Sequence, residues 1–288
     1  MAVAVRPAAS DSEQLPRIVA GREAAPAEWL DWAEEPGQDL IALEEGRVVG
    51  GIHVAIVGRT EAWMESIRVH PDAQGRGIGG QLVREAEALA RHYGSAVLRT
   101  AIPAHEYAAI ALAERAGYRR AASCVVVETT AGPEAAHLPY DAPVVHPRTE
   151  QTPAVLRFME QTAALAAWER LVPLGWRFRR IIPELVRGLI KDRRVAAALR
   201  PERSEDLQAA AIVARPEEAR VIGLIDGTPP GMQAVFGDIL EDAQEREVRR
   251  LVVFAPQLDA LAPLGVREWQ PHPWCPDGLV VVQKSLAS

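Results

Sequence analysis

The residues whose types and spacing could do chemistry lie between Glu65 and Gly80, where a carboxylate is followed by a glycine-rich turn. Glycines occupy positions 75, 77, 79 and 80, and residues without a Cβ allow unusual φ angles and a close approach of a ligand to the backbone. A helical pattern begins directly after the turn, so open amides and the positive end of a helix dipole would meet there. The segment therefore predicts an anion site, with a pyrophosphate group as its natural ligand.

The elements that must position this turn are predicted from hydrophobic periodicity. Residues 61–69 form a strand before the turn, residues 82–93 form an amphipathic helix that ends before Gly94, and residues 96–102 form a buried strand. The order is strand, phosphate turn, helix, strand. The other elements expected in this half are strands at 3–7, 39–43, 48–57 and 122–129, short helical pieces at 12–15 and 27–32, and a helix at 104–116.

Two other phosphate-binding designs fit this turn less well. A Walker loop has a Lys-Ser/Thr pair after its last glycine, whereas Gly80 is followed by Gln81. Residues 75–80 match G-x-G-x-x-G, but in a Rossmann unit the first strand leads straight into the glycines and an acidic residue about 20 positions further on binds the ribose. Here residues 70–74 intervene and no acid lies between Ser95 and Ala104, so a dinucleotide-binding oxidoreductase is a remote third interpretation.

A third design matches the turn and its surroundings. Gln74 to Gly79 satisfies the pattern Q/R-x-x-G-x-G/A, with Val69-His-Pro before it and the segment Leu112 to Tyr118 after it. This combination resembles the GNAT superfamily of acyl-CoA-dependent N-acyltransferases, most closely over residues 67–118 and more loosely over 3–130. The resemblance implies an acetyltransferase that moves an acetyl group from acetyl-CoA to a primary amine, with acetyl-CoA as co-substrate and no metal.

The resemblance also implies the residues that would hold acetyl-CoA. The polar edges of Ile67, Arg68 and Val69 would pair with the pantetheine arm like an added strand. The pyrophosphate would be held by the backbone amides of Gln74, Gly75, Arg76, Gly77, Ile78, Gly79 and Gly80.

The reaction implied is direct attack of an amine on the thioester. An alkylamine with a pKa near 10.4 is mostly protonated at neutral pH, so a base must remove its proton, and Glu65 is the candidate. A solvated or cross-strand-paired carboxylate is an equally weighted interpretation of Glu65. Family members often carry a Tyr that acts as the general acid, and an Asn, at the positions that are Ala113 and Glu106 here. Tyr107 could replace that Tyr only if the helix turns it toward the sulfur of coenzyme A, and packing is its favoured role.

The second half of the chain repeats the order of the first. Proline punctuates residues 131–153, as in a linker, and helices and strands then recur up to a strand at 279–282. We therefore expect an α+β fold (an α/β sandwich) of two tandem GNAT-like domains, each a mixed, mostly antiparallel sheet flanked by helices. The expected ranges are 1–135 for the acetyltransferase domain, 136–153 for a linker and 154–288 for a degenerate copy.

The degenerate copy has Asp226 to Gly231 where its phosphate turn should be. Pro229 and Pro230 have no N–H to donate, and Asp226 would repel an anion. We expect this half not to bind coenzyme A. The Arg-rich segment 176–180 could be a patch for an anionic partner, although a solvated helix face is the commoner explanation, and the segment is left unassigned.

The composition of the chain limits which binding partners and which cellular compartment we expect. The net charge of -7 argues against general nucleic-acid binding, and two cysteines are too few for a disulfide framework or a zinc site. No signal peptide and no apolar stretch of membrane length is recognised, so a cytoplasmic protein with no membrane contact is expected. The acceptor would be a small-molecule or peptide amine, a homodimer is left open, and the alternative function is a non-catalytic acyl-CoA-binding or sensing protein.

Overall fold

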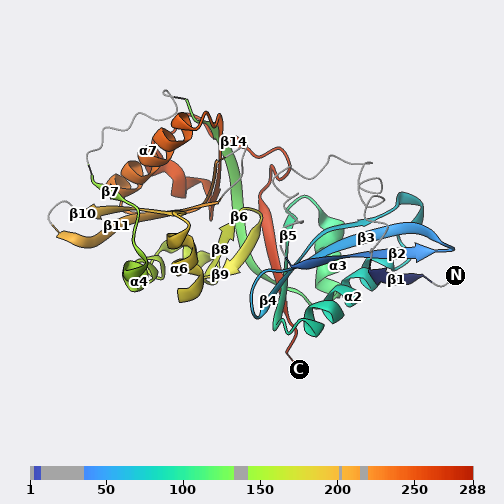
Figure 1. Ribbon diagram of the computed structural model, residues 1–288. Helices are drawn as coiled ribbons and strands as arrows, with labels where there is room; N and C mark the ends of the chain where they lie inside the picture. The colour runs from blue at the N-terminus through green and yellow to red at the C-terminus, as the bar shows by residue number, and fades with distance from the viewer. Residues whose placement is uncertain (1–2, 8–35, 133–141, 201–202, 215–219, 288) are drawn as a thin grey trace. The chain divides into compact units, whose positions relative to one another are not determined.

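The computed structural model describes residues 3–7, 36–132, 142–200, 203–214 and 220–287 (Figure 1). The chain divides into two compact units, and neither is a single continuous segment. The first unit consists of residues 1–102, 106–120 and 281–288, and the second consists of residues 103–105 and 121–280. The helical pieces expected at 12–15 and 27–32 lie outside the described residues.

In the described residues, the first unit is a mixed sheet with two α-helices. Its strands follow the order β1-β2-β3-β4-β5-β15, of which β1 to β4 form the expected antiparallel meander and β5 runs parallel to β4. Helix α2 packs along the sheet formed by β2, β3 and β4 (Figure 1). The bounds are β1 Ala4–Pro7, β2 Gly37–Glu44, β3 Arg47–Ile56, β4 Glu61–Val69, α2 Ile78–His92, β5 Val97–Pro103, α3 Tyr107–Arg115 and β15 Leu279–Ser285.

Helix α2 joins the sheet through an apolar face and a glycine. The buried side chains on this face include Ile78, Leu82 and Ala86. A Cβ at Gly50 of β3 would lie 3.3 Å from Leu82 Cδ1 and 2.9 Å from a backbone oxygen of β4, so the close approach requires glycine. The helix predicted from 82 to 93 is confirmed, and it begins four residues earlier than predicted because Gly79 and Gly80 adopt helical geometry.

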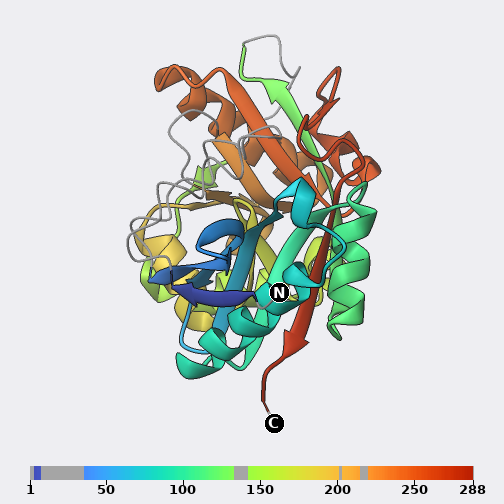
Figure 2. The ribbon, with the colours of Figure 1, turned by 90° about the vertical axis from the view of Figure 1, so that its right-hand side faces the viewer.

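The strand β15, red in Figure 2, is fixed to the first unit by an ion pair between the half-buried Lys284 and the buried Glu87. Lys284 Nζ donates to Glu87 Oε1 of α2 at 2.8 Å and to the Ala116 carbonyl at the end of α3 at 2.7 Å. The same ammonium lies 5.7 Å from the centre of the Tyr118 ring. Burial, followed by the nearby Glu87 carboxylate, raises the pKa of Tyr118, so its hydroxyl stays neutral. One lysine of β15 thus joins two helices of this unit.

We expect Lys284→Met to lower the free energy of unfolding by about 2 to 4 kcal/mol, because it leaves the buried Glu87 carboxylate without its lysine partner. Urea denaturation measures the change. Lys191→Met is the matched control, since Lys191 is the other lysine of the chain and is exposed at the end of α6 (Pro183–Lys191). Equal unfolding free energies for the two variants would contradict the structural role of Lys284.

The second unit has a sheet with the order β6-β13-β12-β11-β10-β7, with β14 paired to β6. Strands β12 and β13 are parallel, as β4 and β5 are, and the other neighbours are antiparallel. A separate two-stranded sheet pairs β8 with β9. The bounds are β6 Arg119–Thr130, β7 Val144–Val145, α4 Thr152–Met159, α5 Ala163–Ala167, β8 Leu171–Leu174, β9 Arg177–Arg180, β10 Val195–Arg200, β11 Arg203–Ala214, β12 Arg220–Gly227, α7 Pro229–Glu245, β13 Arg250–Ala255 and β14 Gln270–Pro271.

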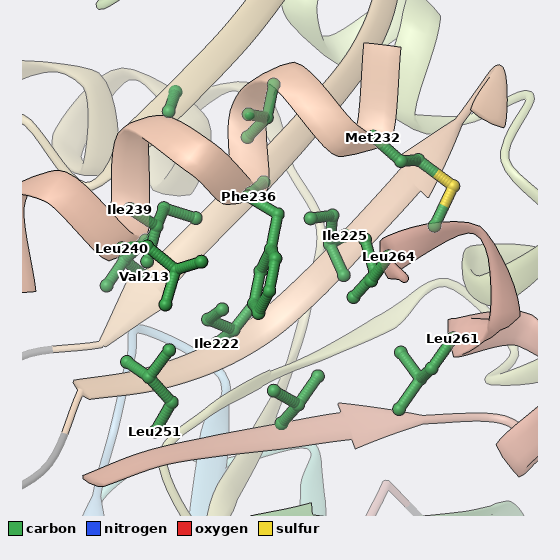
Figure 3. Packing of buried hydrophobic residues seen from close by; sticks show 14 of the residues in the cluster. Val213, Ile222, Ile225, Met232, Phe236, Ile239, Leu240, Leu251, Leu261 and Leu264 are labelled. Atoms are coloured by element: carbon green, nitrogen blue, oxygen red, sulfur yellow. The ribbon is translucent and has the colours of Figure 1, made fainter. Parts of the chain in front are cut away.

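The core of the second unit lies between α7 and the sheet. Figure 3 shows Phe236 and Ile239 of α7 directed at Ile222 of β12 and Leu251 of β13. All four side chains are 2% exposed or less, which confirms the amphipathic helix predicted around residues 232–243. The strand expected at 122–129 to close the first half lies instead in this unit, where β6 pairs with β13.

The Arg-rich segment, left unassigned from the sequence, is a strand and not a helix face. Residues 177–180 form β9, and the apolar side chains Trp176 and Phe178 are buried two positions apart, which is the spacing of a strand. Trp176 packs edge-on against the rings of Phe254, His272 and Trp274, at centroid distances of 5.3, 4.8 and 5.0 Å. The arginines of this segment therefore alternate along the strand with side chains that belong to a small aromatic core.

His272 makes the stability of this core depend on pH. Burial, followed by the positive charge of Arg250, lowers the pKa of His272 from 6.5 to about 4. Between these values the unfolded chain binds a proton that the folded chain does not, so His272 lowers stability as pH falls from 6.5 toward 4. We expect His272→Gln to remove about 2 kcal/mol of the stability loss between pH 7.5 and pH 5, measured by urea denaturation. Parallel pH profiles for the two proteins would contradict this.

Candidate functional site

The glycine-rich turn leads into α2 with its backbone amides open. Gly75 and Gly77 adopt φ angles of 74° and 83°, which side-chain-bearing residues rarely take. Gly77 is the N-cap of α2 and has no side-chain cap hydrogen bond, and the first intrahelical bond runs from Gln81 N to Gly77 O at 3.1 Å. By helix geometry the amides of Ile78, Gly79 and Gly80 have no acceptor within the helix. Three adjacent donors therefore stand at the positive end of the helix dipole.

Side chains of the turn hold its shape rather than extend over it. Gln74 Nε2 donates to the Val69 carbonyl at 3.1 Å, which ties the turn to the end of β4. Arg76 NH1 donates to Glu44 Oε2 of β2 at 3.0 Å, and NH2 contacts Oε1 of the same carboxylate. The hydrogen bond from Arg76 holds the pKa of Glu44 below its usual value. The backbone N–H of Gln74 also donates, to the Pro71 carbonyl at 3.2 Å, so the prediction that this amide binds pyrophosphate is wrong. The backbone amides of residues 75–80 are left as the candidate binding groups.

Gly79 has a packing role in addition to its open amide. A Cβ at this position would lie 3.1 Å from Leu112 Cδ2 of α3 and 3.9 Å from Val69 Cγ2 of β4. Any side chain at residue 79 would therefore press on α3 at the start of α2. By contrast, a Cβ at Gly77 would meet nothing within 4 Å, so glycine is required there for φ alone.

Strands β4 and β5 separate on the carboxyl side of Trp63. Their parallel pairs are Glu61 with Val97, Ala62 with Leu98 and Trp63 with Arg99. Among the described residues, no ladder pair joins the two strands beyond that point, so the half-buried residues 67–69 of β4 lie past the separation. Two carbonyls of this stretch accept from side chains, that of Ile67 from Arg68 NH1 at 2.9 Å and that of Val69 from Gln74 Nε2 at 3.1 Å. The geometry suits an extended ligand chain entering beside β4.

A buried ion pair marks the closed end of this fork between β4 and β5. Arg99 NH1 donates to Glu61 Oε1 at 2.6 Å, and Arg99 Nε donates to Gln283 Oε1 of β15 at 3.0 Å. Both charged side chains are buried, at 3% exposure for Arg99 and 8% for Glu61. The pair links the three strands where β4 and β5 begin to diverge.

Glu65, the predicted base, lies two residues past the last pair of the fork and is 7% exposed. In the antiparallel register it stands opposite His53 of β3, and His53 Nε2 is 3.9 Å from Glu65 Oε1. Ser66 follows with a φ of 55°, at a register shift that gives β4 one extra residue. Such a β-bulge redirects neighbouring side chains. Both interpretations of Glu65, a base and a cross-strand partner, are compatible with this position.

Two residues of this site were missed by sequence reasoning. His53 Nδ1 is 2.8 Å from Asp39 Oδ1 of β2, so Asp39, His53 and Glu65 lie in a row across three strands. The hairpin turn at 45–46 alone would place Asp39 opposite Ile52, because the pair Glu44 with Arg47 fixes that register. A register shift between Ala42 and Leu43 brings His53 opposite Asp39 instead.

The Tyr and the Asn that the family resemblance led us to expect are absent from the corresponding positions at α3. Ala113, where the family has its Tyr, is buried, and Glu106 is the N-cap of α3. Tyr107 is 77% exposed, so the packing role favoured for it is wrong.

The second unit lacks the open amides of the first. Its β12 and α7 are joined by Thr228 alone, whose side chain accepts from Gly231 N at 3.3 Å. Pro229 and Pro230 supply no N–H in the first turn. Asp226, expected to repel an anion, instead accepts from Ala164 N at 2.8 Å and caps α5.

The fork of the second unit is also altered. Its last pair is Ile222 with Val253, so the residue two positions further, the counterpart of Glu65, is Leu224. A Cβ at Gly223 would lie 1.8 Å from the Pro173 carbonyl oxygen, which shows that β8 packs directly against β12 there. The carboxylate is therefore not repeated, and β8 covers a face of β12 at this point.

Within the described part of the chain, no three His, Cys, Asp or Glu side chains are grouped to hold a metal ion. Cys124 and Cys275 are both free and buried. Of the helices that the structure describes, none has the length and apolar character needed to cross a membrane.

Comparison with known proteins identifies the class of this site. Residues 7–118 match the model of the Acetyltransferase (GNAT) family. The fold of the whole chain is similar to a tandem GNAT protein from the clavulanic acid biosynthesis pathway, with a TM-score of 0.59, 17% identity and coverage of 100% of this chain and 99% of that one. A GCN5-related N-acetyltransferase from Sphaerobacter thermophilus gives a TM-score of 0.62 and 17% identity, covering 99% of this chain and 96% of that one. Among curated proteins, none matches the chain.

Residues 7–118 are therefore a domain of the GNAT acetyltransferase family, as their motifs predicted. The full-length structural matches show the tandem form of that fold, α+β with a mixed sheet and flanking helices.

We expect Gly77→Asp to raise the Kd for acetyl-CoA at least tenfold, because it places a carboxylate at the open end of α2 and strains a residue at positive φ. Isothermal titration calorimetry measures the affinity. Gly94→Asp is the matched control, with a φ of 78°, open space around it and a position at the opposite end of the same helix. Similar affinities for the two variants would show that the α2 N-terminus is not the anion site.

Proposed function

We propose that the first unit is an N-acetyltransferase that moves an acetyl group from acetyl-CoA to a primary amine. The observation that carries the proposal is the row of open amides at residues 78–80. This row follows the fork between β4 and β5, and the buried Glu65 lies on the open side of that fork. An anion site, a free strand edge and a carboxylate are the three parts that this reaction needs.

The chain's own groups divide the work of binding. The amides of residues 75–80 hold the pyrophosphate of acetyl-CoA, and the backbone of residues 67–69 pairs with its pantetheine arm. The thioester supplies an activated acetyl group with a thiolate leaving group. Fixing the carrier at two separate places orients that group for an amine and lowers the entropy cost of the encounter.

Glu65 acts as the base in this proposal. The acceptor amine binds as its cation, and Glu65 removes a proton so that the nitrogen lone pair becomes available. The burial of Glu65 supports the assignment, because a buried carboxylate that has taken the proton of the amine does not exchange it with bulk water during the reaction. The acceptor is a small-molecule or peptide amine, and the cytoplasm is the proposed compartment.

The second unit is proposed not to bind coenzyme A. Its two prolines and the capped Gly231 amide remove the donors, and Leu224 replaces the carboxylate. We therefore expect one acetyl-CoA per chain in calorimetry.

A second candidate function is a non-catalytic acyl-CoA-binding or sensing protein. The observation in its favour is Ala113, which leaves α3 without the acidic Tyr that the family resemblance led us to expect.

Glu65→Gln separates the two candidates. For the enzyme we expect kcat to fall by about 10²- to 10⁴-fold, with the Kd for acetyl-CoA unchanged within twofold, because the variant removes only the proton acceptor. Thiol release with a panel of primary amines and acetyl-CoA calorimetry are the two measurements. Glu85→Gln, on the exposed side of α2, is the control with the same charge change. Acetyl-CoA binding with no turnover of any amine by the unaltered protein would favour the sensing protein.

A further inference from the structure

Three titratable side chains form a row across the sheet of the first unit. The register pairs Asp39 of β2 with His53 of β3, and His53 with Glu65 of β4. Residues that stand opposite each other in neighbouring antiparallel strands project from the same face of the sheet. This is the face opposite α2, because Gly50 faces α2 and His53 lies an odd number of residues further along a regular strand.

The two ring nitrogens of His53 face separate carboxylates. Nδ1 lies 2.8 Å from Asp39 Oδ1, and Nε2 lies 3.9 Å from Glu65 Oε1. An ionised carboxylate can only accept a hydrogen bond, so Asp39 holds the proton of a neutral imidazole on Nδ1. The lone pair of Nε2 is then directed toward Glu65.

Burial makes this row a path from the interior toward solvent. The side chains of Glu65 and His53 are 5% and 6% exposed, whereas that of Asp39 is 27% exposed. Gly37 leaves room for the ring, since a Cβ there would lie 3.2 Å from both Cε1 and Nε2 of His53. The imidazole is thus held by hydrogen bonding on one side and by packing on its edge.

We propose that the Asp39–His53 pair is the proton acceptor behind Glu65, an inference that rests on the proposed acetyltransferase function. Asp39 and His53 are positioning residues in this arrangement, because they act on the amine through Glu65. A single carboxylate that has taken the proton is neutral and has lost its attraction for a cation. Passing the proton to His53 restores the charge of Glu65 and places the imidazolium between two carboxylates, where the Coulomb interaction is attractive.

The proton balance closes with the groups named. One proton of the ammonium passes to Glu65 and from there to His53 Nε2. The amine nitrogen then forms a bond to the acetyl carbon while the carbon–sulfur bond breaks, and the second nitrogen proton goes to the departing sulfur. After product release, His53 Nε2 returns its proton to water. The sum is an ammonium ion and a thioester giving an amide, a thiol and one free proton.

The first test is the tautomer of His53, which long-range ¹H–¹⁵N NMR reports directly, with His53→Gln used to assign its signals. We expect the Nδ1-protonated form in the unaltered protein and a shift toward the Nε2-protonated form in Asp39→Asn. An Nε2-protonated ring in the unaltered protein, unchanged by Asp39→Asn, would overturn the proposal. This readout needs no amine, and unchanged acetyl-CoA affinity confirms that the variants are folded.

The second test is a double-mutant cycle with the fastest of butylamine, Nα-acetyllysine and a peptide with a free amino terminus. We expect His53→Gln to lower kcat about 10- to 100-fold with the KM for acetyl-CoA within twofold, and the Glu65→Gln, His53→Gln double variant to be no slower than Glu65→Gln. His92→Gln is the control, since His92 is exposed at the end of α2.

The outcomes separate this proposal from the function on which it rests. If the unaltered protein turns over an amine and His53→Gln is equally fast, or if the two losses multiply in the double variant, the proton path is overturned and the acetyltransferase remains. If the unaltered protein binds acetyl-CoA but acetylates none of the three amines, both proposals are overturned.

Discussion

The first unit depends on the buried ion pair between Glu61 and Arg99. Removing two charges from water is costly, and such a pair often adds little stability compared with apolar residues of the same volume. Its value here is geometric, because Arg99 contacts Glu61 on β4 and Gln283 on β15 from its own place on β5. An arginine with only one of these partners would leave a buried donor unsatisfied. The pair therefore specifies which strands meet at the closed end of the fork and where the fork must open.

The two units show how the same topology can keep or lose a binding site. Both have a parallel strand pair that leads into a long helix, but eight residues join β4 to α2 and one joins β12 to α7. The long connection allows Gly77 to cap its helix without a side chain, which leaves three donors open. In the short connection, two prolines and a threonine cap take up the same positions. The fold is retained because it depends on the buried faces, whereas the site depends on donors that contribute nothing to the core.

Much of the fold could be predicted from the sequence, since its signals are local. The glycine turn, the meander and the faces of α2 and α7 follow from φ requirements and periodicity, and β4 was predicted with the bounds that the structure has. The row of Asp39, His53 and Glu65 could not be predicted, because two register shifts decide which side chains stand opposite each other. The segment 176–180 could not be assigned from the sequence for another reason: a strand as short as β9 offers too few residues to separate a period of 2 from one of 3.6.

The inclusion of β15 in the first unit has a consequence for synthesis on the ribosome. The glycine turn and Glu65 are made before both helices are complete, but Gln283 and Lys284, which contact Arg99 and Glu87, follow roughly 170 residues after the end of α3. At a translation rate of 5 to 20 residues per second, that delay is about 10 to 30 seconds. During this time β5 lacks its outer neighbour and exposes an unpaired edge. The amino-terminal half is therefore not an independent module, and its assembly is completed only when β15 has been made.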